Sequence, residues 1–509
     1  MVTVRLGDEL SFDDVAAVAN RNAVVEIAPH VAGRMASARR IVEDAVKSGR
    51  TVYGITTGIG DLANVRIDPA EAERLQRDIV RSHATAVGPR LPTEVVRAML
   101  LLRARTFAFG ISGVRFEMVE RIMRMLNACV HPVVPSQGSL GASGDLAPLA
   151  HLALPLLGEG TVEWKGEDRP AGEVLRATGI QPLRLSHKEG LALVNGTEMM
   201  LALGILTYCA AERLARSADI IGAMSVEACF GTDRVFAEQL ITLRKHPGAS
   251  LVAGNLRKLL EDSAIVASHR DSEHLVQDAY SLRCIPQVHG AYRDAFAYVR
   301  ATLEAELSSA IDNPTVMVES GGVVSGGNFH GEAMGLALDH LGLCLTGYGT
   351  ISERRTARLV DPNLNNGLPP FLTTDPGRRS GFMLLQYTAA SLVSENRGLC
   401  WPASSDSIPS SAGQEDHVSM GATSARRATS ILSNSELILA IEALSSAQGL
   451  DLRGLPPAAG TGAALGSVRE VSAHVDEDRS LSPDVMATRD ILAAGGLISG
   501  VERRIGEIA

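Results

Sequence analysis

The chain has 509 residues, of which 45% are hydrophobic and 21% are charged. These proportions predict a folded globular protein. They exclude collagen-like and disordered classes, because no glycine period exists and the apolar content is sufficient to bury a core. The net charge of −10 argues against a nucleic-acid-binding surface, which usually carries clustered lysine and arginine. We therefore expect a small molecule, and no nucleic acid, as the partner.

The sequence carries no signal for export or for membrane insertion. Residues 1–9 lack the basic start and apolar core of a signal peptide. The longest apolar runs, 146–157 and 199–211, are shorter than the roughly 18 residues that span a bilayer. The six cysteines form no CxxC pair, the 13 histidines show no metal-ligand spacing, and no dinucleotide or Walker loop is present. We expect a cytoplasmic protein without membrane contact, metal or nucleotide.

Helical periodicity dominates the chain. The predicted long helices, in chain order, cover residues 93–109, 197–216, 288–311, 333–345, 380–397 and 418–448. Several are apolar on nearly all sides, which is typical of the middle of a helix bundle. Short β-hairpins are predicted at 162–166 and 315–324.

The predicted organisation is one mainly α unit, because no linker, repeat or composition break divides the chain. We expect a long central helix bundle with small β-hairpins. The predicted parts are an N-terminal part over about 1–200, central long helices over about 200–450 and C-terminal helices over 450–509.

A glycine-rich loop precedes one of the apolar helices. Gly138, Gly141 and Gly144 release the backbone from the usual φ/ψ limits, and Asp145 can cap the helix that follows. By local chemistry alone, this pattern is more typical of a tight loop that enters a core helix. In a forced bend, however, Ala142-Ser143-Gly144 can cyclise and lose two waters. The product is an electrophilic methylidene-imidazolone, which the positive end of the helix would favour.

Five motifs accompany this loop in order along the chain. They are Tyr53-Gly54-Ile55-Thr56-Thr57-Gly58, Leu193-Val194-Asn195-Gly196-Thr197, Gln277-Asp278-Ala279-Tyr280-Ser281-Leu282-Arg283-Cys284, Gly326-Gly327-Asn328-Phe329-His330 and Gln414-Glu415-Asp416-His417. With the loop motif over 138–151, this set resembles the aromatic amino acid ammonia-lyase family from about residue 53 to beyond residue 420. The resemblance implies a helical bundle of the ammonia-lyase/fumarase-aspartase-like type. It also implies a homotetramer whose active sites are shared between subunits.

The resemblance also implies the catalytic groups. The family cofactor, 4-methylidene-imidazol-5-one, would form from Ala142, Ser143 and Gly144, and the substrate amine would attack it. Tyr53 would be the base that removes the β-hydrogen, which requires a phenol pKa lowered from its usual value near 10. Tyr280 would assist proton transfer or formation of the cofactor.

The residues expected to bind substrate lie on several of these motifs. Arg283 can pair bidentately with the substrate carboxylate, a geometry that arginine suits better than lysine. By resemblance, Asn195 contacts the cofactor and the substrate, Gln277 belongs to the binding set, and Phe329 stacks on the substrate ring.

The choice of amino acid is expected to depend on two residues. The four-residue spacing of Leu75, Ile79, His83 and Val87 predicts one inward helix face. Ser82-His83-Ala84 resembles the histidine-specific members of the family, and Glu415 stands where phenylalanine and tyrosine enzymes have Gln. A carboxylate can pair with an imidazole ring. The resemblance therefore implies elimination of ammonia from L-histidine to give trans-urocanate.

Four positions depart from the family pattern: Ile59 replaces Phe, Glu198 replaces Gln or a small residue, Trp401 replaces the His of many histidine-specific members, and Gly413 replaces Asn. The alternatives within the class are a tyrosine or phenylalanine ammonia-lyase and an aromatic amino acid 2,3-aminomutase. A non-catalytic helical scaffold would require decay of the 142–144 tripeptide or loss of Tyr53 and Arg283. The tripeptide and both of these residues are intact.

Overall fold

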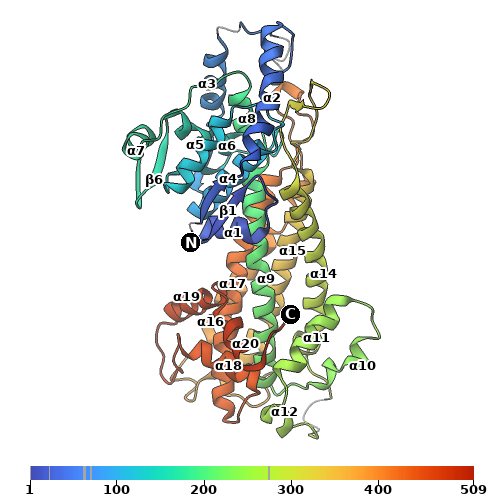
Figure 1. Cartoon of the computed structure of the whole chain (residues 1–509). Coiled ribbons are helices and arrows are strands. Elements are labelled where there is room, and N and C mark those ends of the chain that lie inside the picture. The colour runs from blue at the N-terminus through green and yellow to red at the C-terminus, as the bar shows by residue number, and fades with distance from the viewer. Residues whose placement is uncertain (1, 22, 61–64, 69–70, 273–275) are drawn as a thin grey trace. The chain divides into compact units, whose positions relative to one another are not determined.

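Long helices dominate the computed structural model, which describes residues 2–21, 23–60, 65–68, 71–272 and 276–509 (Figure 1). The long helices include α9 (Glu198–Ala228), α14 (Ile285–Ser308), α15 (Glu332–Val360), α16 (Met383–Leu399) and α17 (Gly421–Arg453). The predicted mainly α fold class is confirmed. Across the described residues, no helix combines the length and apolar character needed to cross a membrane.

The remaining α-helices of the described residues come before, between and after these along the chain. They are α1 (Phe12–Arg21), α2 (His30–Lys47), α3 (Ala72–His83), α4 (Thr93–Ala108), α5 (Phe116–Asn127), α6 (Leu146–Ala153), α7 (Ala171–Thr178), α8 (Glu189–Val194), α10 (Glu238–Ile241), α11 (Pro247–Leu259), α12 (Ala264–Ser268), α13 (Tyr280–Arg283), α18 (Ala459–Arg469), α19 (Ser482–Ala493) and α20 (Gly496–Ile505). Helix α4 confirms the prediction at 93–109 to within one residue.

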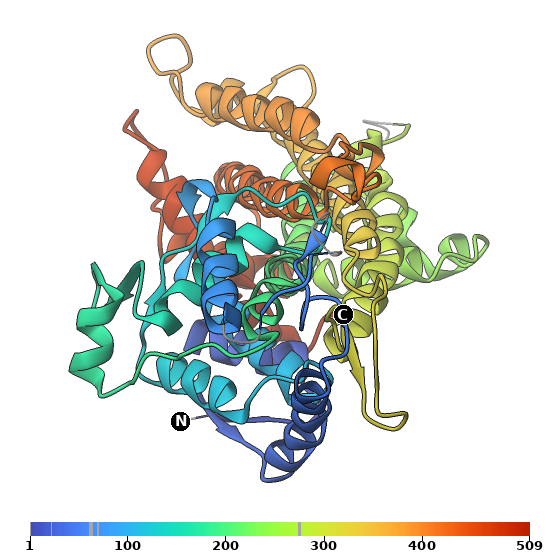
Figure 2. The same cartoon turned by 90° about the horizontal axis from the view of Figure 1, so that it is seen from above.

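The strands of the described residues are short and form small sheets. Strands β1 (Thr3–Leu6) and β2 (Val24–Ile27) are parallel, whereas β3 (Val87–Arg90) and β5 (Pro135–Gln137) are antiparallel. Strand β6 (Thr161–Trp164) pairs with β4 (His131–Pro132) and β7 (Glu167–Pro170), and β8 (Thr315–Met317) pairs with β9 (Gly322–Val324). Both predicted hairpins are confirmed. The hairpin β6–β7 and α7 lie on the outside of their unit (Figure 2).

The chain divides into two compact units that are discontinuous in sequence. Unit 1 comprises Met1–Leu206, Arg300–Asp339 and Pro402–Arg426, and unit 2 comprises Thr207–Val299, His340–Trp401 and Arg427–Ala509. Helices α9, α14, α15 and α17 therefore contribute residues to both units.

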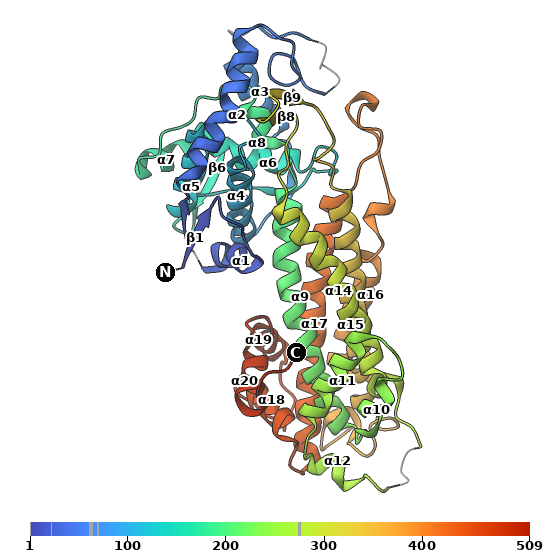
Figure 3. The same cartoon turned by 45° about the vertical axis from the view of Figure 1, so that its right-hand side comes forward.

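The core of unit 1 is built around α4, which is buried from Val95 to Ala108. Helices α1 and α5 pack against it, as Figure 3 shows. The β8–β9 hairpin packs on α2, where Val316 contacts a cluster that includes Ala38 and Val42. The glycine-rich loop belongs to the same unit, where β5 precedes it and α6 follows it.

Buried polar pairs connect the helices of unit 2. The guanidinium of Arg355 on α15 contacts Glu442 on α17, with Nε 2.5 Å from Oε1 and neither side chain exposed. His289 on α14 contacts Asp219 on α9, with Nδ1 2.8 Å from Oδ1. These pairs connect helices that are distant in sequence.

Candidate active site

The glycine-rich loop between β5 and α6 adopts the sharp bend that its sequence predicts. The φ angles of Gly138, Gly141 and Gly144 are 142°, 70° and 74°. A Cβ at Gly144 would overlap the carbonyl oxygen of Gly196, to which Gly144 is paired by a parallel backbone bridge. Glycine is therefore required at position 144 both by its φ angle and by this close approach.

The side chain of Asp145 caps a different helix from the one that was predicted. Asp145 lies at the N-cap position of α6 without a capping hydrogen bond there. Instead, its Oδ2 accepts the N–H groups of Met199 and Met200, at 2.9 and 3.0 Å, in the first turn of α9. Unpaired N–H groups at the start of a helix attract a buried carboxylate. Burial, and secondarily Glu198, raises the pKa of Asp145 to about 7 against the lowering effect of these hydrogen bonds.

The serine of the tripeptide faces a carboxylate from a distant segment of unit 1. Ser143 is half-buried, and its Oγ donates to Oε1 of Glu415 at 3.3 Å. Ser410 donates from its Oγ to the other oxygen, Oε2, at 2.5 Å, and its backbone pairs with that of Glu415. Ala142 packs in a buried cluster with Val418 and neighbouring residues. The tripeptide is thus fixed on one side by apolar packing and on the other by Glu415.

Asn195 lies beside the same loop, at the C-terminal end of α8. Its side chain is 2% exposed, and its Nδ2 donates to the carbonyl of Asn313 at 2.8 Å. Its Oδ1 is buried and has no hydrogen-bond partner among the described residues. A buried acceptor without a donor is costly, so this oxygen is placed to receive a hydrogen bond from a bound group.

Tyr53 lies in a turn that is held by its own threonines. Its side chain is half-buried, and its hydroxyl oxygen accepts the N–H of Gly60 at 3.1 Å. Within the turn, Thr56 Oγ1 donates to the carbonyl of Arg50 at 2.7 Å, and Thr57 Oγ1 accepts the N–H of Gly54 at 3.2 Å.

His83 is the last residue of α3, and its ring is held by the helix itself. Its Nδ1 lies 2.8 Å from the carbonyl of Ile79, so the Nδ1–H tautomer is favoured and Nε2 remains an acceptor. The predicted inward row through Val87 is wrong, because α3 ends at His83 and Val87 begins β3 with 63% of its surface exposed. Gly88 has a φ of 82°, which is incompatible with continuation of the helix.

The other predicted substrate residues lie on two different units. Phe329 is half-buried in the turn before α15, in unit 1. Gln277, Tyr280 and Arg283 belong to unit 2, where Gln277 is exposed and the Tyr280 ring is 72% exposed. The guanidinium of Arg283 lies over that ring at 4.8 Å, and its buried Nε has no acceptor among the described residues.

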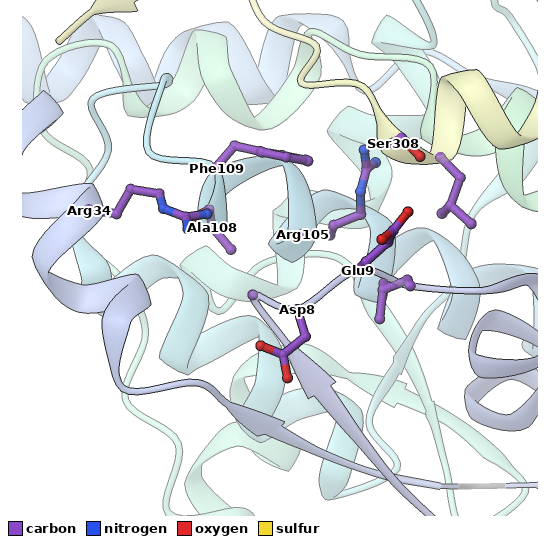
Figure 4. Close-up of a pocket in the computed structure, with 10 residues that line it drawn as sticks. Asp8, Glu9, Arg34, Arg105, Ala108, Phe109 and Ser308 are labelled. Atoms are coloured by element: carbon purple, nitrogen blue, oxygen red, sulfur yellow. The ribbon is translucent and has the colours of Figure 1, made fainter. Parts of the chain in front are cut away.

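Unit 1 also contains a cavity of about 280 Å³ that is separate from these residues. Figure 4 shows its charged lining residues Asp8, Glu9, Arg34 and Arg105, and none of the predicted site residues lines it. Among the described residues, no group of three or more His, Cys, Asp or Glu is arranged to hold a metal ion.

Three neighbours of the site were not predicted. Ser410 contacts Glu415, Asn313 accepts from Asn195, and Gly196 pairs with Gly144. Gly196 lies within the Leu193–Thr197 motif, so the sequence offered a signal that it belongs to the site. The contact of Ser410 with Glu415 depends on the fold of the 410–415 loop, and the contact of Asn313 with Asn195 joins segments far apart in sequence.

Comparison with known proteins identifies the family. The model of the family described as aromatic amino acid lyase matches residues 10–470. The chain belongs to the aromatic amino acid lyase family. A histidine ammonia-lyase from Gloeobacter violaceus is 49% identical over 503 residues, which cover 99% of this chain and 98% of the relative. The predicted family and the predicted class of enzyme, an ammonia-lyase, are confirmed.

Solved structures of this lyase family share the fold. The crystal structure of histidine ammonia-lyase from Trypanosoma cruzi is similar with a TM-score of 0.91 at 42% identity, and the match covers 100% of this chain and 96% of that one. The tyrosine aminomutase from Streptomyces globisporus is similar with a TM-score of 0.94 at 36% identity, with 100% of both chains covered. The backbone is thus common to members that are named for different reactions, and the substrate must be argued from side chains.

Proposed function

We propose that the chain eliminates ammonia from L-histidine to give trans-urocanate. The observation that carries this proposal is the contact between Ser143 and Glu415, which places a carboxylate beside the tripeptide expected to form the reactive group. The relatives named histidine ammonia-lyase, which match nearly the full length, support the same substrate.

The residues of the loop fit the proposed 4-methylidene-imidazol-5-one. Ala142 is held by apolar packing, and Gly144 occupies a conformation and a close contact that only glycine tolerates. The orphaned Oδ1 of Asn195 is available to a group formed at this loop. When formed, the group supplies an electrophilic carbon for the substrate amine. Ala142, Ser143 and Gly144 are its proposed source, and no metal or nucleotide is required for it.

The proton-transfer roles fall to two tyrosines in the proposed mechanism. Tyr53 removes the β-hydrogen, and the Gly60 N–H that its oxygen accepts holds the hydroxyl in place. Tyr280 assists proton transfer, and its exposed ring is available to a site outside its own unit. Arg283 is proposed to bind the substrate carboxylate, and Gln277 of the same segment belongs to the proposed binding set. Asn195 and Phe329 complete the proposed set.

The proposed preference for histidine rests on complementary hydrogen bonding to a ring. His83 donates Nδ1–H to Ile79, which leaves Nε2 as an acceptor for a substrate N–H. Glu415 offers a carboxylate to the same ring. A benzene or phenol ring would leave these groups unpaired, and such losses discriminate strongly between substrates.

The assembly proposed for this function is a cytoplasmic homotetramer with shared active sites, in which residues 1–509 act as one lyase unit. The 72% exposure of both Tyr280 and Trp401 supports it, because large aromatic side chains at the surface are typical of interfaces.

The intact mass of the purified chain tests the proposed chemistry. Cyclisation and serine dehydration each expel one water, so the mass should be about 36 Da below that encoded. Ser143→Ala lacks the hydroxyl that leaves as the second water, so it should remain folded, show no such dehydration and lose nearly all turnover of L-histidine. A parent chain at its full encoded mass would contradict the proposed function.

An aminomutase remains the second candidate, because the tyrosine aminomutase fold matches over the full length. It would return the amine to the β-carbon, so a β-amino acid in place of trans-urocanate would select it.

A further inference from the structure

A buried ion pair contacts the Asn195-Gly196 peptide, which in turn contacts the glycine-rich loop. Arg103 on α4 and Glu198 at the start of α9 have side-chain exposures of 1% and 2%, and Nη1 lies 3.3 Å from Oε2. The Oε1 atom of Glu198 accepts from Thr106 Oγ1 at 2.9 Å. The Arg103 guanidinium also lies 4.7 Å from the Phe107 ring centroid. The proposed catalytic steps use neither member of the pair.

Arg103 holds the backbone on which the loop rests. Its Nη1 donates to the carbonyl of Asn195 at 2.8 Å, and its Nη2 donates to the carbonyl of Ile311 at 3.3 Å. A Cβ added to Gly196 would overlap Oε2 of Glu198 and approach Nη1 of Arg103 within 2.5 Å. The pair therefore fixes the Asn195-Gly196 peptide, because it leaves no space for this peptide to move toward Arg103 and Glu198.

The Asn195-Gly196 peptide also contacts the glycine-rich loop, through the carbonyl of Gly196. The Asp145 N–H donates to the carbonyl of Gly196 at 2.6 Å, and Gly144 and Gly196 form a parallel bridge. A Cβ at Gly144 would overlap the Gly196 oxygen. The nitrogen of Gly144 is thus positioned by Gly196, which is itself positioned by Arg103 and Glu198.

We propose that Arg103 and Glu198 are a positioning pair for the self-cyclisation of Ala142-Ser143-Gly144, acting through the Asn195-Gly196 peptide. This inference rests on the proposed function. In the reaction, the Gly144 nitrogen bonds to the Ala142 carbonyl carbon. That carbonyl oxygen leaves as water with the N–H protons of Gly144 and Ser143, and Ser143 then loses Oγ–H and its Cα hydrogen as a second water. No oxidant is needed. The main contribution of the protein is therefore to hold the reacting atoms in the correct positions.

We expect the alignment of the reacting atoms to limit the rate of cyclisation, because an amide nitrogen is a weak nucleophile. Reaction needs its nitrogen held within about 3–3.5 Å of the carbonyl carbon, and a loss of alignment of 1 Å slows such reactions strongly. Burial, and secondarily the charge of Glu198, raises the pKa values of the carboxyl groups of Asp145 and Glu306.

The test follows cyclisation by intact mass rather than by activity. Full-length Glu198→Ala and Arg103→Lys chains should accumulate at the encoded mass and convert about tenfold or more slowly than the parent, as expected for the loss of a charge-assisted hydrogen bond. Glu198→Gln keeps an acceptor for Thr106 and for Arg103. It should fold and convert at an intermediate rate, and it serves as the second variant if Glu198→Ala does not fold.

The matched control is Glu442→Ala, which breaks the equally buried Arg355–Glu442 pair of unit 2. It should lower the Tm to a comparable extent and leave the conversion complete. Parental conversion rates in Arg103→Lys and in the Glu198 variants would overturn the inference, as would an equal deficit in Glu442→Ala. A parent chain that shows no loss of mass would instead contradict the proposed function.

Discussion

Glu415 receives hydrogen bonds on both carboxylate oxygens, from Ser143 and from Ser410. The carboxylate is therefore held in one orientation beside the tripeptide. The tripeptide and Glu415 could be predicted from the sequence because each lies in a contiguous motif. The orienting contact of Ser410 could not, because it depends on the fold of the 410–415 loop, in which Ser411 and Ala412 have φ angles of 49° and 54°. Such left-handed conformations are unusual for residues other than glycine.

The histidine preference can be tested with a double-mutant cycle at His83 and Glu415. Each of His83→Phe and Glu415→Gln should lower kcat/KM for L-histidine, because each removes a proposed polar partner of the imidazole ring. The two effects should be non-additive, with a coupling energy of about 0.5–3 kcal/mol, since both residues would hold one ring. Steady-state kinetics of the parent and three variants provide the measurement. Full additivity would contradict a shared ring site.

At the scale of elements, the helices were predicted more reliably than their ends. The prediction at 197–216 begins one residue before α9, and the prediction at 333–345 lies within α15. The two helices extend beyond these predictions to Ala228 and Val360. Both extensions contain charged residues, which interrupt the apolar pattern. In the structure, Asp219 and Arg355 are buried in these extensions because His289 and Glu442 pair with them. Periodicity along one helix carries no information about a partner on another helix.

The parallel β1–β2 pair was not predicted for a related reason. Its strands have only four residues each, and Thr3 pairs with Val24 across an intervening helix. Local sequence identifies hairpins through their turns, as at β8–β9, whereas a parallel pair needs a crossover that leaves no local signal.

The start of α9 gives a pH-dependent prediction through Asp145. The folded-state pKa of about 7 is above the unfolded value of about 3.9, so the folded chain binds more protons than the unfolded chain between these values. This contribution to the free energy of unfolding is fully present below about pH 4 and is lost as pH rises to about 7. Asp145→Asn does not titrate and keeps an acceptor for α9.

The measurement compares the Tm of the parent with that of Asp145→Asn at several pH values. The parent should lose stability relative to the variant as pH rises from about 4 to 7, and the difference should be constant above that range. Other titrating groups are common to both proteins and cancel in the difference. A difference that is constant from pH 4 to 7, or that changes in the opposite direction, would contradict the raised pKa.

At the scale of the whole molecule, the predicted site residues are divided between two units. The tripeptide, Tyr53 and Glu415 belong to unit 1, and Tyr280 and Arg283 belong to unit 2. In a homotetramer with shared sites, these two groups can come from different copies of the chain.

Co-expression of Ser143→Ala with Tyr280→Phe tests this sharing. Each variant alone should be nearly inactive. If Ser143 and Tyr280 of one site come from different subunits, random mixing in equal amounts restores about a quarter of the sites, because each contributor is intact in half of the cases. Turnover of L-histidine by tetramers that carry two different affinity tags provides the measurement. Mixed tetramers no more active than the single variants would place both residues in the same subunit.

The most direct test of the account is the product formed by the parent enzyme from L-histidine, L-tyrosine and L-phenylalanine in parallel, identified by NMR. We expect stoichiometric trans-urocanate and ammonia from L-histidine, with a kcat/KM far above those for the other two amino acids. A preference for L-tyrosine or L-phenylalanine, or the appearance of a β-amino acid, would contradict it.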